Sequence, residues 1–374
     1  MVESKNIIRY KENIGLSYNL ERVMMNTKIY QIDFNNTNTI QMEEAGSLIR
    51  KGELVAFPTE TVYGLGGDAL HPEAAKKIYE AKGRPSDNPL IVHVAEFADL
   101  ERIAKEVPAQ AKILADAFWP GPLTMIVWKN EHVPYATTGG LDTVAVRMPN
   151  HPVALALIKK SGCLIAAPSA NTSGRPSPTE ASHVQEDMDG RIAMILDGGS
   201  VGIGIESTII DLTEQPPMVL RPGYITTEML ADVLGEEVVL DPAILTSDNM
   251  KQPKAPGMKY KHYAPKADMV IVDGKKESVI GYINRVSEQM HKEQKKIAII
   301  ATEETRDSYY ADVVLCMGKR EDEDAIAKHM YKILRKCDEL EVDIIYSESF
   351  QTPRIGQAIM NRLLKAAGHQ VICV

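Results

Sequence analysis

The sequence predicts an α/β protein built from two domains. Short β-rich runs alternate with amphipathic helices over the first two thirds of the chain, and this pattern breaks down between 241 and 267. A second, shorter alternation of strands and helices follows. A chain of 374 residues is long enough for two domains that each have a core. We therefore expect an N-terminal extension over 1–26, a large domain over 27–240, an interdomain connector over 241–267 and a small domain over 268–374.

In the large domain, runs rich in β-branched and apolar residues predict strands, and periodic apolar positions predict helices. A strand-like run, TKIYQIDF, begins the domain at residue 27. The strands expected after it cover 54–59, 89–95, 123–128, 143–148, 163–169, 192–198 and 207–212. The expected helices cover 42–51, 72–81, 97–106, 108–117, 151–160 and 226–234. This alternation is typical of an α/β domain.

The connector, DPAILTSDNMKQPKAPGMKYKHYAPKA, is rich in Pro and Lys and shows no sustained periodicity. Beyond it, we expect strands over 269–274, 297–302, 313–318 and 342–349 and helices over 277–294, 324–340 and 356–367. These elements indicate a small parallel, Rossmann-like β/α domain. Because no G-x-G-x-x-G follows its first strand, a dinucleotide site there is poorly supported.

The charge balance and the cysteines exclude several classes of protein. Lys plus Arg total 42 against 51 Asp plus Glu, so the net charge of −9 argues against binding nucleic acid by bulk charge, and any anion site must be local. The four cysteines form no C-x-x-C pair, which excludes a zinc ribbon and favours free, buried thiols. No apolar run approaches the roughly 18 residues that cross a bilayer, and no signal peptide is evident, so we expect a cytoplasmic protein without a membrane partner.

Polar and glycine-bearing segments gather where the first strands end, which is where an open α/β fold binds its ligands. The segment 58–67 is rich in hydroxyls and glycines and predicts either a wall that hydrogen-bonds a small polar ligand or a turn that caps a helix. In the next loop, Lys82 and Arg84 can converge on one phosphate chain, or they can form an ordinary solvated helix end. His93, on an apolar strand, is either a ligand contact or a core histidine.

Later strands carry the same kind of residue. Arg147 shares a strand face with Thr143. If Arg147 faces inward, it needs an anionic partner such as a substrate carboxylate. If it faces outward, it is an ordinary solvent-exposed charge at the edge of the sheet. The small-residue turn 168–174 suits close approach to a phosphate or a ribose, although a simple Ser/Asn turn would look the same. The segments 206–208 and 221–223 place further polar residues at two strand ends.

Eight motifs then stand in the order seen in one family. They are TETVYGLG (59–66), KGRPSDNPL (82–90), WPGPLT (119–124), TVAVRMP (143–149), PSAN (168–171), ESTIID (206–211), RPG (221–223) and APGMKYKHYAP (255–265). In this order they resemble the YrdC-type L-threonylcarbamoyladenylate synthases, in the long form that adds a small C-terminal α/β domain. The resemblance covers about residues 27–374.

The resemblance implies a fold and a reaction. The expected fold is a twisted, mostly parallel sheet with helices around a positively charged central cavity. The expected enzyme is a nucleotidyltransferase that converts L-threonine, bicarbonate and ATP into L-threonylcarbamoyl-AMP and pyrophosphate. Mg²⁺ would accompany ATP, with no organic cofactor and no dedicated metal site. The product would feed the enzymes that install threonylcarbamoyladenosine in tRNA, and whether this chain itself binds tRNA is left open.

The resemblance also implies roles for individual residues. The catalytic quartet falls on Lys82, Arg84, Ser169 and Asn171. Contacts to L-threonine fall on Thr61, His93, Arg147 and Ser207. Contacts to ATP fall on Arg84, Asn88, Thr143, Ser169, Asn171, Arg221 and, from the connector, Tyr263.

Three other functions agree less well with the sequence, and one motif allows two structural interpretations. An RNA-binding module conflicts with the acidic total charge and the lack of an aromatic stacking motif. A carbamoyltransferase with a YrdC domain would carry C-x-x-C zinc motifs, and a serine hydrolase would carry a G-x-S-x-G elbow, both of which are absent. The basic, aromatic motif 255–265 predicts a lid over a filled pocket, with a solvated linker as the alternative.

Overall fold

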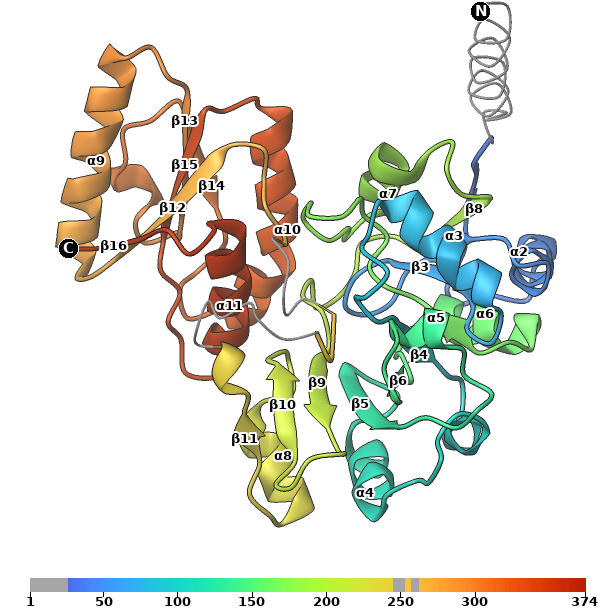
Figure 1. Ribbon diagram of the computed structural model, residues 1–374. Helices are drawn as coiled ribbons and strands as arrows, with labels where there is room; N and C mark the ends of the chain where they lie inside the picture. Colours follow the sequence, from blue (N-terminus) through green and yellow to red (C-terminus); the bar gives the residue numbers. More distant parts are fainter. Residues whose placement is uncertain (1–25, 245–252, 257–261) are drawn as a thin grey trace, which may run out of the picture.

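The computed structural model describes residues 26–244, 253–256 and 262–374. Most of the expected N-terminal extension, and the connector residues 245–252 and 257–261 with much of the predicted lid, lie outside the described residues. Within them, eleven strands between Lys28 and Leu240 form one sheet, and five strands between Asp268 and Cys373 form another. Figure 1 shows the two sheets in separate halves of the molecule, the first coloured blue to yellow and the second orange to red.

The large sheet places strands from distant parts of the chain side by side. In spatial order it contains β1 (Lys28–Gln31), β8 (Met194–Asp197), β2 (Val55–Phe57), β3 (Gly64–Asp68), β7 (Ile165–Ala166), β4 (Ile91–His93), β6 (Thr143–Arg147), β5 (Leu123–Trp128), β9 (Thr208–Asp211), β10 (Met218–Arg221) and β11 (Val239–Leu240).

The α/β class is confirmed, but the pairing is mixed rather than mostly parallel. The pairs β1–β8, β2–β8, β4–β6, β5–β9 and β10–β11 are parallel. The pairs β2–β3, β3–β7, β4–β7, β5–β6 and β9–β10 are antiparallel. Strands that follow one another closely, such as β9 and β10, pair antiparallel because a parallel pair needs a long crossover connection.

The helices of the large domain begin and end at residues that favour those positions. α3 (Pro72–Lys82) starts on a proline and ends at Gly83, which has a left-handed φ of 61°. Side chains of Thr39 and Thr226 cap the N-termini of α2 and α8. The other α-helices of this domain are α2 (Ile40–Arg50), α4 (Ala109–Phe118), α5 (Tyr135–Thr138), α6 (Pro152–Ser161), α7 (Ala181–Met188) and α8 (Thr227–Leu234).

Some elements differ from the expectation. The helix expected over 97–106 is a shorter 3-10 helix, Phe97–Arg102, because the chain then joins the sheet, where the Lys105 N–H donates to the Trp128 carbonyl at 2.8 Å. The glycine-rich β3 was not predicted. A Cβ added at Gly66 would lie 2.8 Å from carbons of Phe57 and Ile165, so close packing between strands requires glycine there. The elements α5, α7, β11 and β16 were not predicted either.

The small domain has the expected parallel, Rossmann-like arrangement. Its strands are, in spatial order, β14 (Val313–Cys316), β13 (Ile297–Ala301), β15 (Ile344–Glu348), β12 (Asp268–Asp273) and β16 (Val371–Cys373), and all pair parallel. Its α-helices are α9 (Lys276–Lys292), α10 (Glu323–Glu339) and α11 (Gly356–Ala366). The four cysteines of the chain are free, but only Cys337 is buried. Cys163 and Cys316 are half-buried and Cys373 is exposed, contrary to the expectation of buried thiols.

The two domains meet in one hydrophobic cluster, beside the clusters that each domain has of its own. A single cluster of buried side chains contains Val62 and Ile205 of the large domain, Tyr263 of the connector, Met330 of α10 and Ile359 of α11. In Figure 1, α10 and α11 lie on the side of the small domain that faces the large one. The contact is close, because a Cβ added at Gly204 would lie 2.4 Å from the Cα of Lys328 in α10. Apolar packing therefore fixes the small domain against the large one.

Candidate active site

A cavity in the large domain brings most of the predicted site residues together. It contains about 700 Å³ of empty space, including the part open to solvent. All the predicted site residues line it except Asn88 and Thr143. Those that do are Thr61, Lys82, Arg84, His93, Arg147, Ser169, Asn171, Ser207, Arg221 and Tyr263. Glu206, Ser177 and His262 also line it, although sequence reasoning gave them no role.

Strand register gathers one group of these residues at one edge of the sheet. His93 ends β4 and is directly opposite Arg147, which ends the parallel neighbour β6. On the other side of β6, Thr124 of β5 is opposite Arg147 and shares a hydrogen bond of 2.7 Å with Ser207, just before β9. The sequence predicted the side chains at this edge, but not the pairing that aligns them.

Arg147 faces inward, which decides between its two interpretations. Its side chain is buried, its Nη1 donates to Thr61 Oγ1 at 2.9 Å, and its Nε donates to the Gly121 carbonyl at 3.3 Å. Its Nη2 lies 2.7 Å from Glu60 Oε1, so the anionic partner that a buried guanidinium needs is supplied by the protein. A ligand carboxylate would have to share Arg147 with Glu60, a residue that sequence reasoning did not single out.

His93 is a buried, neutral imidazole. Its Nδ1 lies 3.2 Å from the Ile91 carbonyl, a contact that favours a proton on Nδ1. Burial and, to a smaller extent, the nearby charge of Arg147 lower the pKa of His93 to about 3. The side chain can therefore offer shape and a hydrogen bond to a ligand at neutral pH, but no positive charge.

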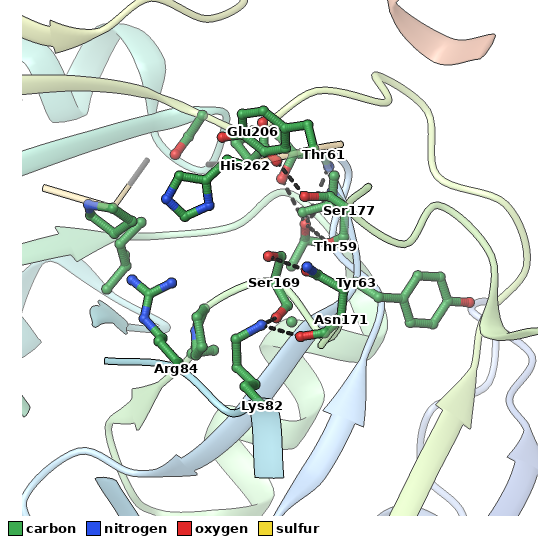
Figure 2. A pocket seen from close by; sticks show the side chains of 18 of the residues that line it. Thr59, Thr61, Tyr63, Lys82, Arg84, Ser169, Asn171, Ser177, Glu206 and His262 are labelled. Carbon is green, nitrogen blue, oxygen red and sulfur yellow. Dashed lines mark hydrogen bonds between the residues drawn. The ribbon is translucent and has the colours of Figure 1, made fainter. Parts of the chain in front are cut away.

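Lys82 reaches from the end of α3 to the turn after β7. Its Nζ donates to the carbonyl of Ser169 at 2.6 Å and to that of Asn171 at shorter distance, and Ser169 Oγ donates to Asn171 Oδ1 at 2.6 Å. Figure 2 shows Lys82, Ser169 and Asn171 close together, with Arg84 to the left of Lys82. Burial, followed by repulsion from Arg84, lowers the pKa of Lys82 well below its ordinary value. An anionic ligand would favour the charged form of this ammonium.

Arg84 is held by the loop that follows it. Its Nε donates to the Asn88 carbonyl at 3.3 Å and its Nη2 to the Pro89 carbonyl at 3.1 Å. Burial lowers the pKa of Arg84 to about 10, so the guanidinium stays charged at neutral pH. Asn88 is buried behind Arg84 and does not line the cavity, and no group in the described part of the chain hydrogen-bonds its side-chain oxygen.

Thr143 lies away from the cavity. It shares a face of β6 with Arg147 but begins the strand that Arg147 ends, which at about 3.3 Å per residue separates the two by roughly 13 Å. It is opposite Trp128 in the ladder with β5. The geometry therefore does not bring Thr143 to the other predicted residues.

Arg221 closes the cavity on the side of β9 and β10. Its Nε donates to the Ser207 carbonyl at 3.0 Å, and its Nη2 donates to Ser207 Oγ at 3.1 Å. Its Nη1 lies 3.4 Å from the carbonyl of Pro256 in the connector. His262 and Tyr263, also from the connector, complete this side of the lining.

Four cations, three of them buried and Arg84 half-buried, therefore face one cavity. They are Lys82, Arg84, Arg147 and Arg221. Glu206 and, beside Arg147, Glu60 are the carboxylates placed against them. An excess of buried positive charge around empty space suits a polyanionic ligand. Among the residues that the structure describes, no cluster of His, Cys, Asp and Glu could hold a metal ion.

Comparison with known proteins places the chain in a family. Residues 47–223 match a family model described as "Telomere recombination", that of the Sua5, YciO and YrdC proteins. Residues 225–368 match the model described as "Threonylcarbamoyl-AMP synthase, C-terminal domain".

Relatives match over most of the chain. A threonylcarbamoyl-AMP synthase of Pyrococcus abyssi is 51% identical over 330 residues, which are 88% of this chain and 95% of that protein. One of Bacillus subtilis is 48% identical over 352 residues, 93% of this chain and 100% of that protein. The crystal structure of P. abyssi Sua5 complexed with L-threonine superposes with a TM-score of 0.86 at 48% identity and covers 93% of this chain and 99% of that chain.

The fold, the cationic cavity and these matches define an enzyme of the nucleotidyltransferase type. More narrowly, the chain belongs to the threonylcarbamoyl-AMP synthase family, in the long form that carries the C-terminal domain. In the part of the chain that the structure describes, no helix has both the length and the apolar character needed to cross a membrane.

Proposed function

We propose that this chain synthesises L-threonylcarbamoyl-AMP from L-threonine, bicarbonate and ATP, and releases pyrophosphate and water. The observation that carries the proposal is the set of four cations around one cavity, three buried and one half-buried, in a chain that belongs to this family. A triphosphate and a carbamate are both anions, so a reaction that joins them needs such a site.

The edge of the sheet around Arg147 is the proposed site for L-threonine. Arg147 would bind the carboxylate, and Thr61, His93 and Ser207 would hydrogen-bond the rest of the amino acid. A neutral His93 fits this role, since it adds no charge near the threonine amine, which must be unprotonated to react. The crystallised relative with L-threonine bound supports this choice of amino acid.

The other walls are the proposed site for ATP. Lys82 and Arg84 would neutralise the phosphates, the turn of Ser169 and Asn171 would bring hydroxyl and amide groups close to them, and Arg221 would act from the opposite side. The remaining proposed nucleotide contacts are Tyr263, Asn88 and Thr143. The last two require the nucleotide to reach beyond the cavity lining.

The chemistry needs positioning and electrostatics, with no covalent enzyme intermediate. The neutral amine of threonine attacks carbon dioxide or bicarbonate to give a carbamate. A carbamate oxygen then attacks the α-phosphorus, and the bond to pyrophosphate breaks. The four cations reduce the repulsion between the two anions and stabilise the charge that builds on the phosphoryl oxygens.

Mg²⁺ would enter with the triphosphate. The described residues provide no cage of three acidic or imidazole side chains for it, so the phosphates themselves would supply most of its ligands. Bound there, the ion would neutralise charge on the leaving pyrophosphate. Lys82 and Arg84 would orient the phosphates that carry it.

The product sets the class of the next reaction. A mixed anhydride of a carbamate and a phosphate reacts readily with water, so an acyl-transferring enzyme must consume it, and we propose the enzymes that modify tRNA adenosine in the cytoplasm. Binding of tRNA by this chain itself has little support, given the net charge of −9.

Pyrophosphate release tests the proposal. The wild-type protein would be incubated with ATP, Mg²⁺ and bicarbonate and with each amino acid in turn. Release that requires both threonine and bicarbonate is the expected result, and parallel reactions with serine measure the selectivity. Release that is independent of the amino acid, or no release from the folded protein, would overturn the proposed function. In Arg84→Ala, release should fall by about a hundredfold or more.

A further inference from the structure

The small domain places a buried arginine directly behind residues that line the cavity. Arg362 of α11 is 1% exposed. Its Nη1 donates to the Pro222 carbonyl at 2.8 Å, its Nη2 to the Glu206 carbonyl at 3.0 Å, and its Nε to Glu206 Oε2 at 2.8 Å. One guanidinium from the small domain thus bridges two separate segments of the large domain. In Figure 1, α11 lies next to the ends of β9 and β10, where these segments are.

Both segments adjoin residues with a proposed role in substrate binding. Glu206 immediately precedes Ser207, and Pro222 immediately follows Arg221. Arg221 in turn donates to both the carbonyl and the hydroxyl of Ser207. The backbone groups that Arg362 fixes are therefore one residue away from the two side chains.

The β-ladder alone leaves this position less defined. The pairing of β9 with β10 shifts register between Val219 and Arg221, so the ladder is irregular where Arg221 leaves it. The planar guanidinium of Arg362 holds the carbonyls of Glu206 and Pro222 in fixed positions, which the irregular ladder does not do. This makes Arg362 a fixing point for the end of β10.

Glu206 connects the arginine to the rest of the cavity. Ser177 Oγ donates to its Oε1 at 2.5 Å, and the hydroxyl of Tyr331 of α10 donates to its Oε2 at 2.8 Å. Burial favours the neutral acid, but the charges of Arg362 and Arg221 and the Ser177 bond together lower the pKa of Glu206 to about 2. The ring of Tyr331 lies 5.2 Å from that of Tyr263, which lines the cavity.

We propose that the small domain is part of the catalytic machinery: Arg362, assisted by Tyr331, is a positioning residue that holds Ser207 and Arg221 in place through Glu206 and Pro222. This inference rests on the proposed function, because it assigns the small domain a role in the same reaction. It predicts that substrate binding and turnover depend on α11 even though α11 provides no lining residue of the cavity.

A second buried arginine provides the matched control. Arg335 of α10 is also 1% exposed and also crosses the interface, donating to Asp187 Oδ2 at 2.8 Å and to the Pro176 carbonyl at 2.7 Å. Asp187 keeps partners in Arg175 and in the N–H of Thr172, so the turn after Asn171 stays held. Pro176 precedes Ser177 of the cavity lining, but neither Pro176 nor Asp187 adjoins Ser207 or Arg221. Loss of either arginine should destabilise the interface, because it leaves buried partners unpaired, but loss of Arg335 should disturb the site much less than loss of Arg362.

The test compares Arg362→Met, Arg362→Lys, Tyr331→Phe and Arg335→Met with the wild type. Urea unfolding gives the folded fraction under assay conditions, and kcat and KM for ATP and threonine are measured only where that fraction is complete. We expect kcat/KM to fall about a hundredfold in Arg362→Met, as for a displacement of about 1 Å. About tenfold is expected in Arg362→Lys and Tyr331→Phe, and less than about threefold in Arg335→Met.

The pH profile separates positioning from simple stabilisation. Without Arg362, buried Glu206 loses its nearest cation and its pKa must rise, so the kcat/KM of Arg362→Met should decline as the pH is lowered toward 6. The wild type should show no such decline from Glu206. A purely structural role would not change the profile of the folded enzyme.

The outcomes keep the two proposals apart. If wild-type protein shows no threonine-dependent pyrophosphate release, the proposed function fails. If it does, and folded Arg362→Met keeps wild-type kcat/KM, or Arg335→Met loses as much, the positioning role is refuted. Should Arg362→Met not fold, Arg362→Lys and Tyr331→Phe decide, and wild-type kcat/KM in both refutes the role. Calorimetric titration with threonine measures the dissociation constant for threonine in each variant, and so tests the effect on the site independently of turnover.

Discussion

Replacement of Lys82 by methionine separates catalysis from stability. The substitution keeps a long side chain but removes the ammonium that bonds the carbonyls of Ser169 and Asn171. Each carbonyl that loses its donor costs about 1–3 kcal/mol. Removing a buried cation also relieves a desolvation penalty of several kcal/mol, and burial is the main cause of the depressed pKa of Lys82. The two effects oppose each other, so we expect the free energy of unfolding to change by less than about 2 kcal/mol.

The effect of Lys82→Met on the reaction should be much larger. Loss of one preorganised charge at a reacting phosphate typically costs about 10²–10³ in rate, or about 3–4 kcal/mol of transition-state stabilisation. Pyrophosphate release with saturating threonine and bicarbonate measures the rate, and urea unfolding measures stability. Lys76→Met is the matched control, because Lys76 is on the same helix but pairs with Glu73 at the surface. Folded Lys82→Met that retained more than about a tenth of wild-type kcat/KM would refute the reasoning.

Three further predictions test other parts of the structure. In Arg147→Met, KM for threonine should rise about a hundredfold while KM for ATP changes far less; an equal rise in both would contradict the assignment of Arg147 to threonine. Burial holds the pKa of His93 and of His262 at about 3, against about 6.5 when unfolded. The unfolded chain therefore takes up protons first. Urea unfolding should show stability complete above about pH 6.5 and falling by up to about 1.4 kcal/mol per histidine and pH unit as the solution is acidified to pH 5, with a smaller fall in His262→Gln; equal stability at pH 7 and 5 would be the contrary result. Gly204→Ala should lower the free energy of unfolding by several kcal/mol more than Gly235→Ala. Both glycines have a left-handed φ, but only at Gly204 would a Cβ collide with α10. Equal losses in the two variants would show that the two domains can move apart to accept the extra methyl group.

The sequence was most informative where residue type and position carry the chemistry. Lys82 and Arg84 stand in a Gly/Pro loop, and Ser169 and Asn171 follow an apolar strand, so the α/β alternation allowed these residues to meet but left a solvated helix end and a simple turn as alternatives. Their assignment to substrates came from the family resemblance and stays a prediction. Thr143 shares a strand face with Arg147 but does not line the same cavity, so a shared face alone does not place two residues in one site.

Other features depended on contacts between distant segments. The pairing of Glu60 with Arg147 and the antiparallel insertion of β3 are decided by packing across the sheet, for which local propensity gives little indication. Arg362 did leave a signal. It lies three and four residues after Ile359 and Ala358, in the apolar stripe of α11, where a charge is costly unless a buried partner meets it. The stripe could have indicated a buried ion pair, although it could not have identified Glu206.

The hydrophobic cluster shared by the two domains has a consequence for thermal unfolding. In many two-domain proteins, the domains unfold independently, one after the other. Here the side chains of α10 and α11 pack in the same cluster as Val62 and Ile205, and Glu206 finds its counterion 156 residues further along the chain. Unfolding of the small domain would expose the apolar side chains of that cluster and would remove the arginine that pairs with the buried carboxylate of Glu206. Heating should consequently give a single calorimetric transition.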